Sequence, residues 1–222
     1  LFNPEHLDNA KNKDLVLKPL KREGYKYFVG VDPAISTDGD YNVITVIEMD
    51  EEENKSVVYV DRSKNVEFRE NIQKVKLIGQ LFRPEAILFE TNTFAKSFTQ
   101  ELRQVADLNI HDFNTTRRKK QEIILNLQMT LENGKMNFPY GNEESRRVTG
   151  VLLEELSMFA ITERGKFEGV GAHDDMVMSL ALANAATYQA TDNFILLDDM
   201  GIFEDSKPQV RKGRINPMGL NF

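Results

Sequence analysis

The sequence contains no cysteine and no tryptophan, and it has only three histidines among its 222 residues. The lack of cysteine excludes disulfide bonds, thiolate metal sites and cysteine nucleophiles, and it fits a reducing compartment. Only two histidines, His111 and His173, lie in segments with a structured pattern. A histidine-rich zinc site is therefore not expected. A metal site in this chain would need oxygen ligands, which favours Mg²⁺ or Mn²⁺.

Long apolar runs and nucleotide-binding loops are also missing. No apolar stretch approaches the ~20 residues that a membrane-spanning helix needs, and the polar start shows no signal peptide. We therefore expect no membrane partner. No GxxxxGK[ST] phosphate loop occurs, so these residues are not expected to form an ATPase motor. The chain begins without methionine, and we interpret it as part of a longer protein.

The charge balance is acidic, with a net charge of −7 and a pI of about 5.2. Proteins that grip the DNA backbone strongly are usually basic. This balance argues against a strong autonomous nucleic-acid binder. It does not exclude a nuclease, because an acidic metal centre adds to the negative count.

The apolar pattern predicts an α/β domain that begins with three strands joined by short turns, which is an antiparallel meander. These strands are expected at residues 26–35, 42–50 and 55–63. Helical spacing and short apolar runs then alternate. Helices are expected at 66–82, 93–108, 115–134 and 142–159, strands at 85–92 and 109–114, and a short extended piece at 135–139. The result is a mixed sheet with helices on both faces.

Several boundaries follow from local signals. Thr115 or Thr116 is the expected N-cap of the 115–134 helix, and Gly134 its C-terminal stop. Residues 1–24 have poor periodicity and are expected to be a linker that leads into the domain. The domain itself is expected at 25–191. Residues 192–222 turn acidic and then basic, and we expect a tail that is mobile or binds a partner.

Acidic residues end two of the predicted strands and begin the last helix. Asp32 ends the first strand, Glu90 ends the fourth, and Asp174 and Asp175 begin the helix in the segment GAHDDMVMSLALANAA, residues 171–186. An aspartate at a helix start is often a simple cap. One aspartate is enough for that purpose, and the second is a like charge that is tolerated when it faces a cation.

These acids meet if the first and fourth strands are neighbours, because the carboxyl ends of adjacent parallel strands share one crevice. Like charges at close range raise one another's pKa values, and divalent cations remove that cost. Two oxygen-coordinated metals about 4 Å apart would clamp the attacking and leaving oxygens of a phosphodiester. The sequence pattern therefore favours a two-metal site for phosphodiester hydrolysis.

Each of these residues also has a simpler interpretation. Asp32 precedes Pro33 and fits a turn, and Glu90 fits an exposed strand end. Asp38 and Asp40 are interpreted as loop solvation, with an accessory metal position as the alternative. His173 is either a neighbour of the helix cap or a group that polarises water or touches phosphate.

A basic run, Arg117, Arg118, Lys119 and Lys120, lies at the start of the 115–134 helix. Cations there oppose the helix dipole, which favours anions at an N-terminus. The run is either a solvated face or a surface that contacts phosphate, since bound phosphate relieves the unfavourable placement. Arg146 and Arg147 are weaker candidates.

Five segments in consistent order resemble the nuclease domain of the phage large terminase subunit over about residues 26–190: VGVDPA, DGDYNVITVIE, ILFETN, LENGKMNFP and GAHDDMVMSLALA. The resemblance implies a ribonuclease H-like fold that cuts viral DNA concatemers during genome packaging. It implies two Mg²⁺ or Mn²⁺ ions on Asp32, Glu90 and the pair Asp174/Asp175, with Asp175 favoured as the direct ligand. A family lysine corresponds to Lys119 or Lys120.

The resulting hypothesis is a metal-dependent endonuclease that cuts double-stranded DNA with little sequence specificity, because no base-reading motif is present. The expected DNA contacts are Arg117, Arg118, Lys119, Lys120 and His173. The resemblance implies an ATPase motor domain in the same full-length protein, the small terminase and the portal as candidate partners, and a place in the host cytoplasm. The alternatives are an actin-like kinase or ATPase, a Holliday-junction resolvase, and a non-catalytic docking module.

Overall fold

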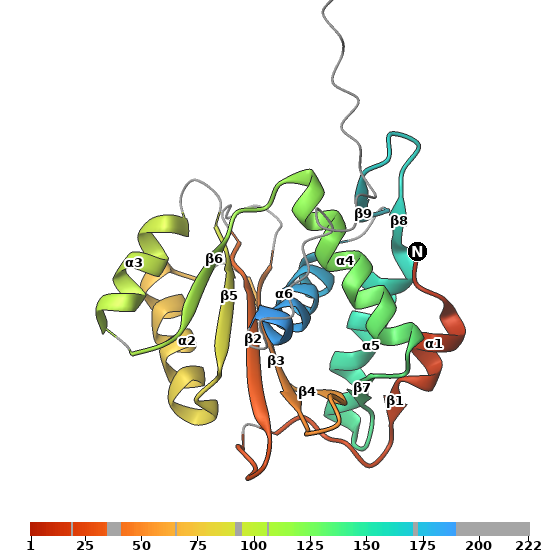
Figure 1. The fold of residues 1–222 in the computed structure, drawn as a ribbon, viewed down its shortest axis with the longest axis horizontal. Helices are drawn as coiled ribbons and strands as arrows, with labels where there is room; N and C mark the ends of the chain where they lie inside the picture. Colours follow the sequence, from red (N-terminus) through yellow and green to blue (C-terminus); the bar gives the residue numbers. More distant parts are fainter. Residues whose placement is uncertain are drawn as a thin grey trace, which may run out of the picture.

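The computed structural model describes residues 1–189 with the exception of 19, 35–40, 65, 92–94, 106, 171 and 172 (Figure 1). The expected tail at 192–222 lies outside the described residues, as do Asp38 and Asp40. The described part forms a seven-stranded mixed sheet in the order β1-β7-β4-β3-β2-β5-β6, with helices on both faces. The predicted fold class is therefore confirmed.

Three central strands form the predicted antiparallel meander. They are β2 (Lys26–Asp32), β3 (Asn42–Met49) and β4 (Lys55–Ser63). On one side, β5 (Ala86–Glu90) runs parallel to β2, and β6 (Ile110–Phe113) runs parallel to β5. On the other side, β7 (Met136–Pro139) runs parallel to β4, and the two-residue β1 (Lys11–Asn12) runs parallel to β7.

The central strands are apolar on both faces because each face is covered by helices. In β2, Phe28 faces one core, whereas Val29 and Val31 face the other. Helices α2 (Phe68–Phe82) and α3 (Ala95–Val105) cover the second face, where Ile72 and Phe82 are buried. Helices α4 (Arg117–Glu132), α5 (Glu143–Met158) and α6 (Asp175–Gln189) lie on the first face.

Helix α6 lies directly against the middle of the sheet, on β2, β3 and β5. Its residues from Met176 to Thr187 are buried, which explains its alanine-rich sequence, because small side chains permit close packing. Gly30 of β2 permits the same approach, since a Cβ at that position would collide with the backbone of Ser179 and Ala183. Ser179 Oγ donates to the carbonyl of Gly30 at 3.0 Å. This packing brings the start of α6 to the end of the sheet where β2 terminates.

The local boundary signals are confirmed for α4. Thr116 is its N-cap, and the Thr116 side chain accepts a hydrogen bond from the backbone N–H of Lys119. Gly134 follows the helix with a φ of 65°, a left-handed conformation that glycine adopts without strain. These signals act within a few residues, and they could therefore be found in the sequence alone.

The first residues differ from the expectation of a linker. They contain helix α1 (Pro4–Asn9), which Asn3 caps, and strand β1. Phe2, Leu7 and Ala10 are buried in the main core. A helix of this length carries too little apolar periodicity to be recognised, and its burial depends on the partners that the fold brings to it.

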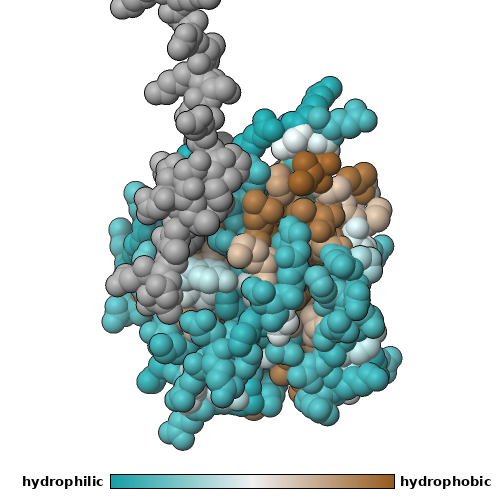
Figure 2. All heavy atoms as spheres, turned by 45° about the vertical axis from the view of Figure 1, so that its right-hand side comes forward, coloured by the Kyte–Doolittle hydropathy of each residue, from teal (hydrophilic) through white to brown (hydrophobic). Residues whose placement is uncertain are grey.

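A second feature without a sequence prediction is the hairpin of β8 (Phe159–Ile161) and β9 (Phe167–Gly169), which follows α5. Met158, Ile161 and Val170 are large apolar side chains exposed in and beside this hairpin. Figure 2 shows a largely hydrophilic surface with an apolar area on the side of the molecule that carries the hairpin. Within the described residues, no helix combines the length and apolar character that crossing a membrane requires.

Candidate active site

Asp32 and Glu90 end neighbouring parallel strands. The register of β2 and β5 pairs Val31 with Phe89, so the next residues on the two strands, Asp32 and Glu90, lie at the same level. Both emerge at the carboxyl ends of their strands, where open α/β sheets form their crevices. The first and fourth predicted strands are therefore neighbours, which is the condition under which the sequence argument brings these acids together.

The start of α6 brings Asp174 and Asp175 to the same place. A pocket of about 230 Å³ opens there, and all four acidic side chains line it. Its other lining residues are Pro33, Ala34, Tyr41, Thr115, Lys120 and Met178. Four acidic residues from β2, β5 and the start of α6 thus meet in one concave site.

The surroundings of Asp32 change its pKa. Desolvation by the surrounding protein raises the pKa of Asp32 well above its usual range. Charge repulsion and hydrogen bonding with Glu90 raise the pKa further, with smaller contributions from Asp175 and Asp174. The cluster therefore favours a proton or another cation beside Asp32.

The two aspartates of α6 have different partners. Asp174 Oδ2 accepts a hydrogen bond from Lys120 Nζ at 2.8 Å. Asp175 Oδ2 accepts one from the backbone N–H of Tyr41 at 3.1 Å, and His173 Nδ1 lies 3.5 Å from the same oxygen. The partners Lys120 and Tyr41 both lie outside α6.

The helix start is capped from elsewhere. The backbone N–H of Met176 donates to Glu155 Oε2 of α5 at 2.9 Å. The N–H of Met176 is therefore bound by Glu155, and not by Asp174 or Asp175 as the simple interpretation of a helix cap would have it.

The donor set is suited to a hard divalent cation, because its side-chain donors are carboxylates. As the side chains lie, however, the described residues include no group of three or more acidic or histidine side chains close enough together to hold a metal ion. Lys120 holds Asp174, and the amide of Tyr41 holds Asp175. The residues present fit a metal ion in type and location.

The basic run at the start of α4 does not act as one patch. Lys120 lines the pocket. Arg117 Nη2 donates to the carbonyls of Arg164 and Gly165, both at 3.0 Å, and so contacts the turn of the β8–β9 hairpin. Lys119 Nζ lies 5.7 Å from the centre of the Phe113 ring. Arg118 is exposed on the same first turn. Of the four residues, Lys120 alone lines the acidic pocket.

Three residues that were not singled out as site residues surround Asp175. Tyr41 binds it through its backbone, Arg62 stacks on the Tyr41 ring, and Glu155 binds Arg62. Burial raises the pKa of Glu155 to about 7, although the Met176 N–H and Arg62 act to lower it. One sequence signal existed for Glu155: it occupies a position on the apolar face of its helix. A buried carboxylate there needs partners.

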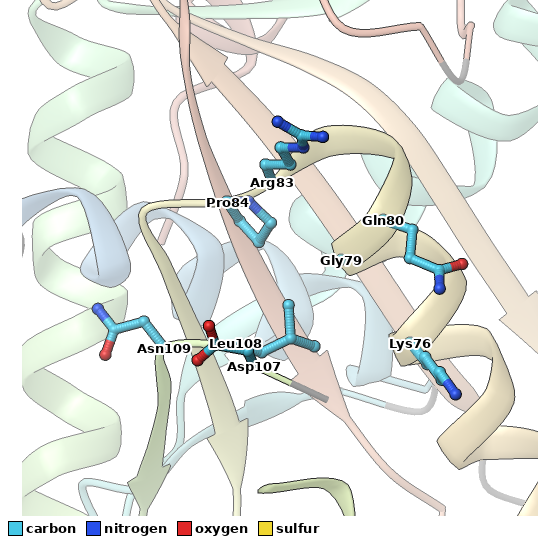
Figure 3. A pocket seen from close by; sticks show the side chains of 8 residues that line it. All are labelled: Lys76, Gly79, Gln80, Arg83, Pro84, Asp107, Leu108 and Asn109. Carbon is cyan, nitrogen blue, oxygen red and sulfur yellow. The ribbon is translucent and has the colours of Figure 1, made fainter. Parts of the chain in front are cut away.

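A larger pocket of about 560 Å³ lies away from the acids (Figure 3). Lys76 and Gln80 of α2 face it from one side, and Asp107, Leu108 and Asn109 border it from the segment that leads into β6. It contains one carboxylate and no cluster of acids. Although this pocket is larger, it lacks the carboxylates that a metal-dependent hydrolytic site needs.

The model of the family described as the terminase RNaseH-like domain matches residues 29–186. This match spans more than half of the chain and includes all four acids of the pocket.

The chain belongs to the terminase RNase H-like domain family.

Solved structures agree with this assignment. The large terminase nuclease from thermophilic phage G20c with bound magnesium is 22% identical, with a TM-score of 0.61, over 81% of this chain and 94% of that one. The nuclease domain of the large terminase subunit gp2 of bacterial virus Sf6 is 11% identical, with a TM-score of 0.59, over 82% and 97% of the two chains.

The large terminase of bacteriophage HK97 also matches. It is 10% identical, with a TM-score of 0.61, over 82% of this chain but only 42% of that chain. A comparison with curated proteins gives no match. At these identities the solved structures show the shared ribonuclease H-like fold, which agrees with the sheet order described above.

Proposed function

We propose that this terminase-family domain is a metal-dependent DNA endonuclease. It cuts concatemeric double-stranded DNA during viral genome packaging, by two-metal phosphodiester hydrolysis with little sequence specificity. The observation that carries the proposal is the convergence of Asp32, Glu90, Asp174 and Asp175 in one open pocket at the carboxyl ends of β2 and β5.

Asp32, Glu90 and Asp175 would hold two Mg²⁺ or Mn²⁺ ions, with Asp174 as a further ligand. The crowding that raises the pKa of Asp32 supports this assignment, because a bound cation relieves the same repulsion. The nuclease domain of the phage G20c terminase has been crystallised with magnesium, cobalt and zinc. Such ions supply activation of water and neutralisation of phosphate charge.

The protein's own groups orient the carboxylates. The Tyr41 amide binds Oδ2 of Asp175 and so helps to orient this carboxylate. Lys120 neutralises Asp174 at the pocket wall, and its ammonium can contact a phosphate that enters the pocket.

We propose that Lys120 and His173 contact the DNA backbone nearest the site, and that Arg117, Arg118 and Lys119 contact it further out. His173 is 41% exposed beside Asp175, which leaves part of its ring accessible to DNA. The net charge of −7 predicts weak DNA binding by this domain alone. We therefore propose that an ATPase motor domain of the same full-length protein provides additional binding to DNA. The small terminase and the portal are the other proposed partners. The proposed place of action is the host cytoplasm.

Cleavage of supercoiled plasmid tests the proposal. The chain is incubated with Mn²⁺, Mg²⁺, Ca²⁺ or EDTA, beside Asp32→Asn and Asp175→Asn. The matched control is Asp107→Asn, an exposed aspartate in the other pocket. Metal-dependent nicking and linearisation, lost in the two site variants and kept in the control, are the expected results.

Cleavage that persists in EDTA, or in both site variants, would contradict the proposal. Absence of both cleavage and metal binding by the folded chain would favour the docking-module alternative. A strong preference for four-way junctions over linear duplex would instead favour the resolvase alternative.

A further inference from the structure

The start of α6 is bound by a carboxylate from a different helix. The first N–H groups of a helix have no partner within it, and a side chain just before the helix usually supplies one. Here the N–H of Met176 donates to Glu155 of α5, at 2.9 Å and 21 residues earlier in the chain. Asp174 directly precedes the helix, at the usual capping position, and Asp175 is its first residue. Their side chains bind Lys120 and the backbone of Tyr41 instead. Glu155 thus binds the N–H of Met176, while both aspartates line the pocket.

Glu155 is also connected to Asp175 through contacts with Arg62 and Tyr41. Its other oxygen, Oε1, accepts a hydrogen bond from Arg62 Nη2 at 3.2 Å. The guanidinium carbon of Arg62 lies 3.3 Å from the centre of the Tyr41 ring. The backbone N–H of Tyr41 then donates to Asp175 Oδ2. The residues Glu155, Arg62 and Tyr41, here called the Glu155 relay, therefore form a chain of contacts that ends at the Asp175 carboxylate.

A buried carboxylate is not needed to cap this helix. Glu155 is 3% exposed, and its charge repels that of Asp175. An apolar side chain at this position, with Asp174 or Asp175 as the cap, would form the same packing without a buried charge. Glu155 does not line the pocket itself. It acts on the neighbours of Asp175.

We propose that Glu155 and Arg62 are positioning residues that hold the Asp175 carboxylate aimed into the pocket and thereby set its affinity for divalent cations. The inference rests on the proposed function, because it assigns a purpose to the orientation of Asp175. Groups that orient metal ligands from behind typically change metal affinity by 10- to 100-fold when they are replaced.

The test is a calorimetric titration of the chain with Mn²⁺ in the absence of DNA. Wild type is compared with Glu155→Gln and with Glu48→Gln. Glu48 is the matched control, since it is also a buried carboxylate (2% exposed) bound by an arginine, Arg22, but it lies near the opposite end of β3. We expect Glu155→Gln to weaken Mn²⁺ binding about tenfold or more, and Glu48→Gln to lose stability without changing Mn²⁺ affinity.

A second variant, Arg62→Lys, keeps the positive charge beside Glu155 but loses the planar group that stacks on Tyr41. It should also weaken Mn²⁺ binding, and the double variant with Glu155→Gln should bind no more weakly than the weaker single variant. This variant tests the relay even where Glu155→Gln fails to fold.

Unchanged Mn²⁺ affinity in folded Glu155→Gln would overturn the inference and leave the proposed function standing. An equal loss of affinity in Glu48→Gln would also overturn it, because the effect would then be general destabilisation. A wild-type chain that binds no Mn²⁺ would overturn the proposed function, and the inference with it.

Discussion

Lys120 of α4 donates a hydrogen bond to Asp174 at 2.8 Å, so a cation already lies at the wall of the acidic pocket. Both side chains are partly exposed, at 23% and 27%. The ion pair is therefore expected to contribute little to stability. Under the proposed function its main effect is on the site, because the ammonium would compete with a metal ion for Asp174 and would lie close to the DNA phosphate.

The substitution Lys120→Gln is expected to keep or strengthen Mn²⁺ binding while it lowers the rate of plasmid cleavage roughly tenfold or more, since a positive group near the reacting phosphate is lost. Stability should change by less than about 1 kcal/mol. Calorimetry, cleavage kinetics and urea denaturation measure the three effects. Lys76→Gln in α2, at the pocket that has no cluster of acids, is the control. Weaker Mn²⁺ binding in Lys120→Gln would show that Lys120 does not compete for Asp174.

Lys55 provides a prediction for the pH dependence of stability. It is 4% exposed, and its ammonium donates to Asn184 Oδ1 at 2.9 Å near the C-terminal ends of α4 and α6, a location that favours a cation. Burial nevertheless lowers the pKa of Lys55 to about 8, with Glu53 acting in the opposite direction. Between pH 8 and the ordinary value of 10.5, the unfolded chain binds a proton that the folded chain does not.

The free energy of unfolding should therefore rise with pH across that window because of this group. Relative to Lys55→Met, wild type is expected to gain about 2 kcal/mol between pH 7 and pH 9.5. Urea denaturation of both proteins at several pH values measures the difference between their free energies of unfolding. The contributions of the other titrating groups are the same in both proteins and cancel in this difference. Parallel pH profiles for the two proteins would contradict a lowered pKa at Lys55.

Gly30 is expected to tolerate no larger residue. A Cβ there would collide with the backbone of α6, which cannot move without disturbing the packing against the sheet. We expect Gly30→Ala to lower the free energy of unfolding by about 2–3 kcal/mol or more. The control is Gly150→Ala in α5, where nothing lies within 4 Å of the added atom. It should raise stability by about 0.5–1 kcal/mol. Denaturation that ranks the two variants the other way would contradict this packing.

The first residues are predicted to contribute to the stability of the domain. Leu7 of α1 is 5% exposed in the main core, whereas Leu20 is 65% exposed. Leu7→Ala should therefore destabilise the chain by about 2–4 kcal/mol, and Leu20→Ala should have an effect near zero. Chemical denaturation provides the comparison. Equal effects of the two substitutions would show that the first residues do not stabilise the domain, as expected of a linker.

Much of the fold could be predicted from the sequence because its signals are local. The strands β2, β3 and β4 and the helices α2, α4 and α5 carry apolar spacing that indicates one type of structure. Thr116 and Gly134 mark the two ends of α4 within a few residues. Asp32 and Glu90 could be identified as site candidates because each closes an apolar strand. Their meeting depended on whether β2 and β5 are neighbours, which the sequence left open and which the pairing of the two strands decides.

The tertiary structure decided which charged group meets which. Four basic residues in a row are alike in sequence, yet only Lys120 among them lines the pocket, and Arg117 binds the hairpin turn instead. Glu155 stands on the apolar face of its helix, but its partner Met176 is brought to it only when α5 and α6 pack together. The sequence by itself determined the central strands, most of the helices and the candidate acids, because backbone periodicity and capping act over a few residues. Only the folded chain decided the cap of α6 and the partners of Asp174 and Asp175, because ion pairs and buried hydrogen bonds depend on distances between segments far apart in sequence.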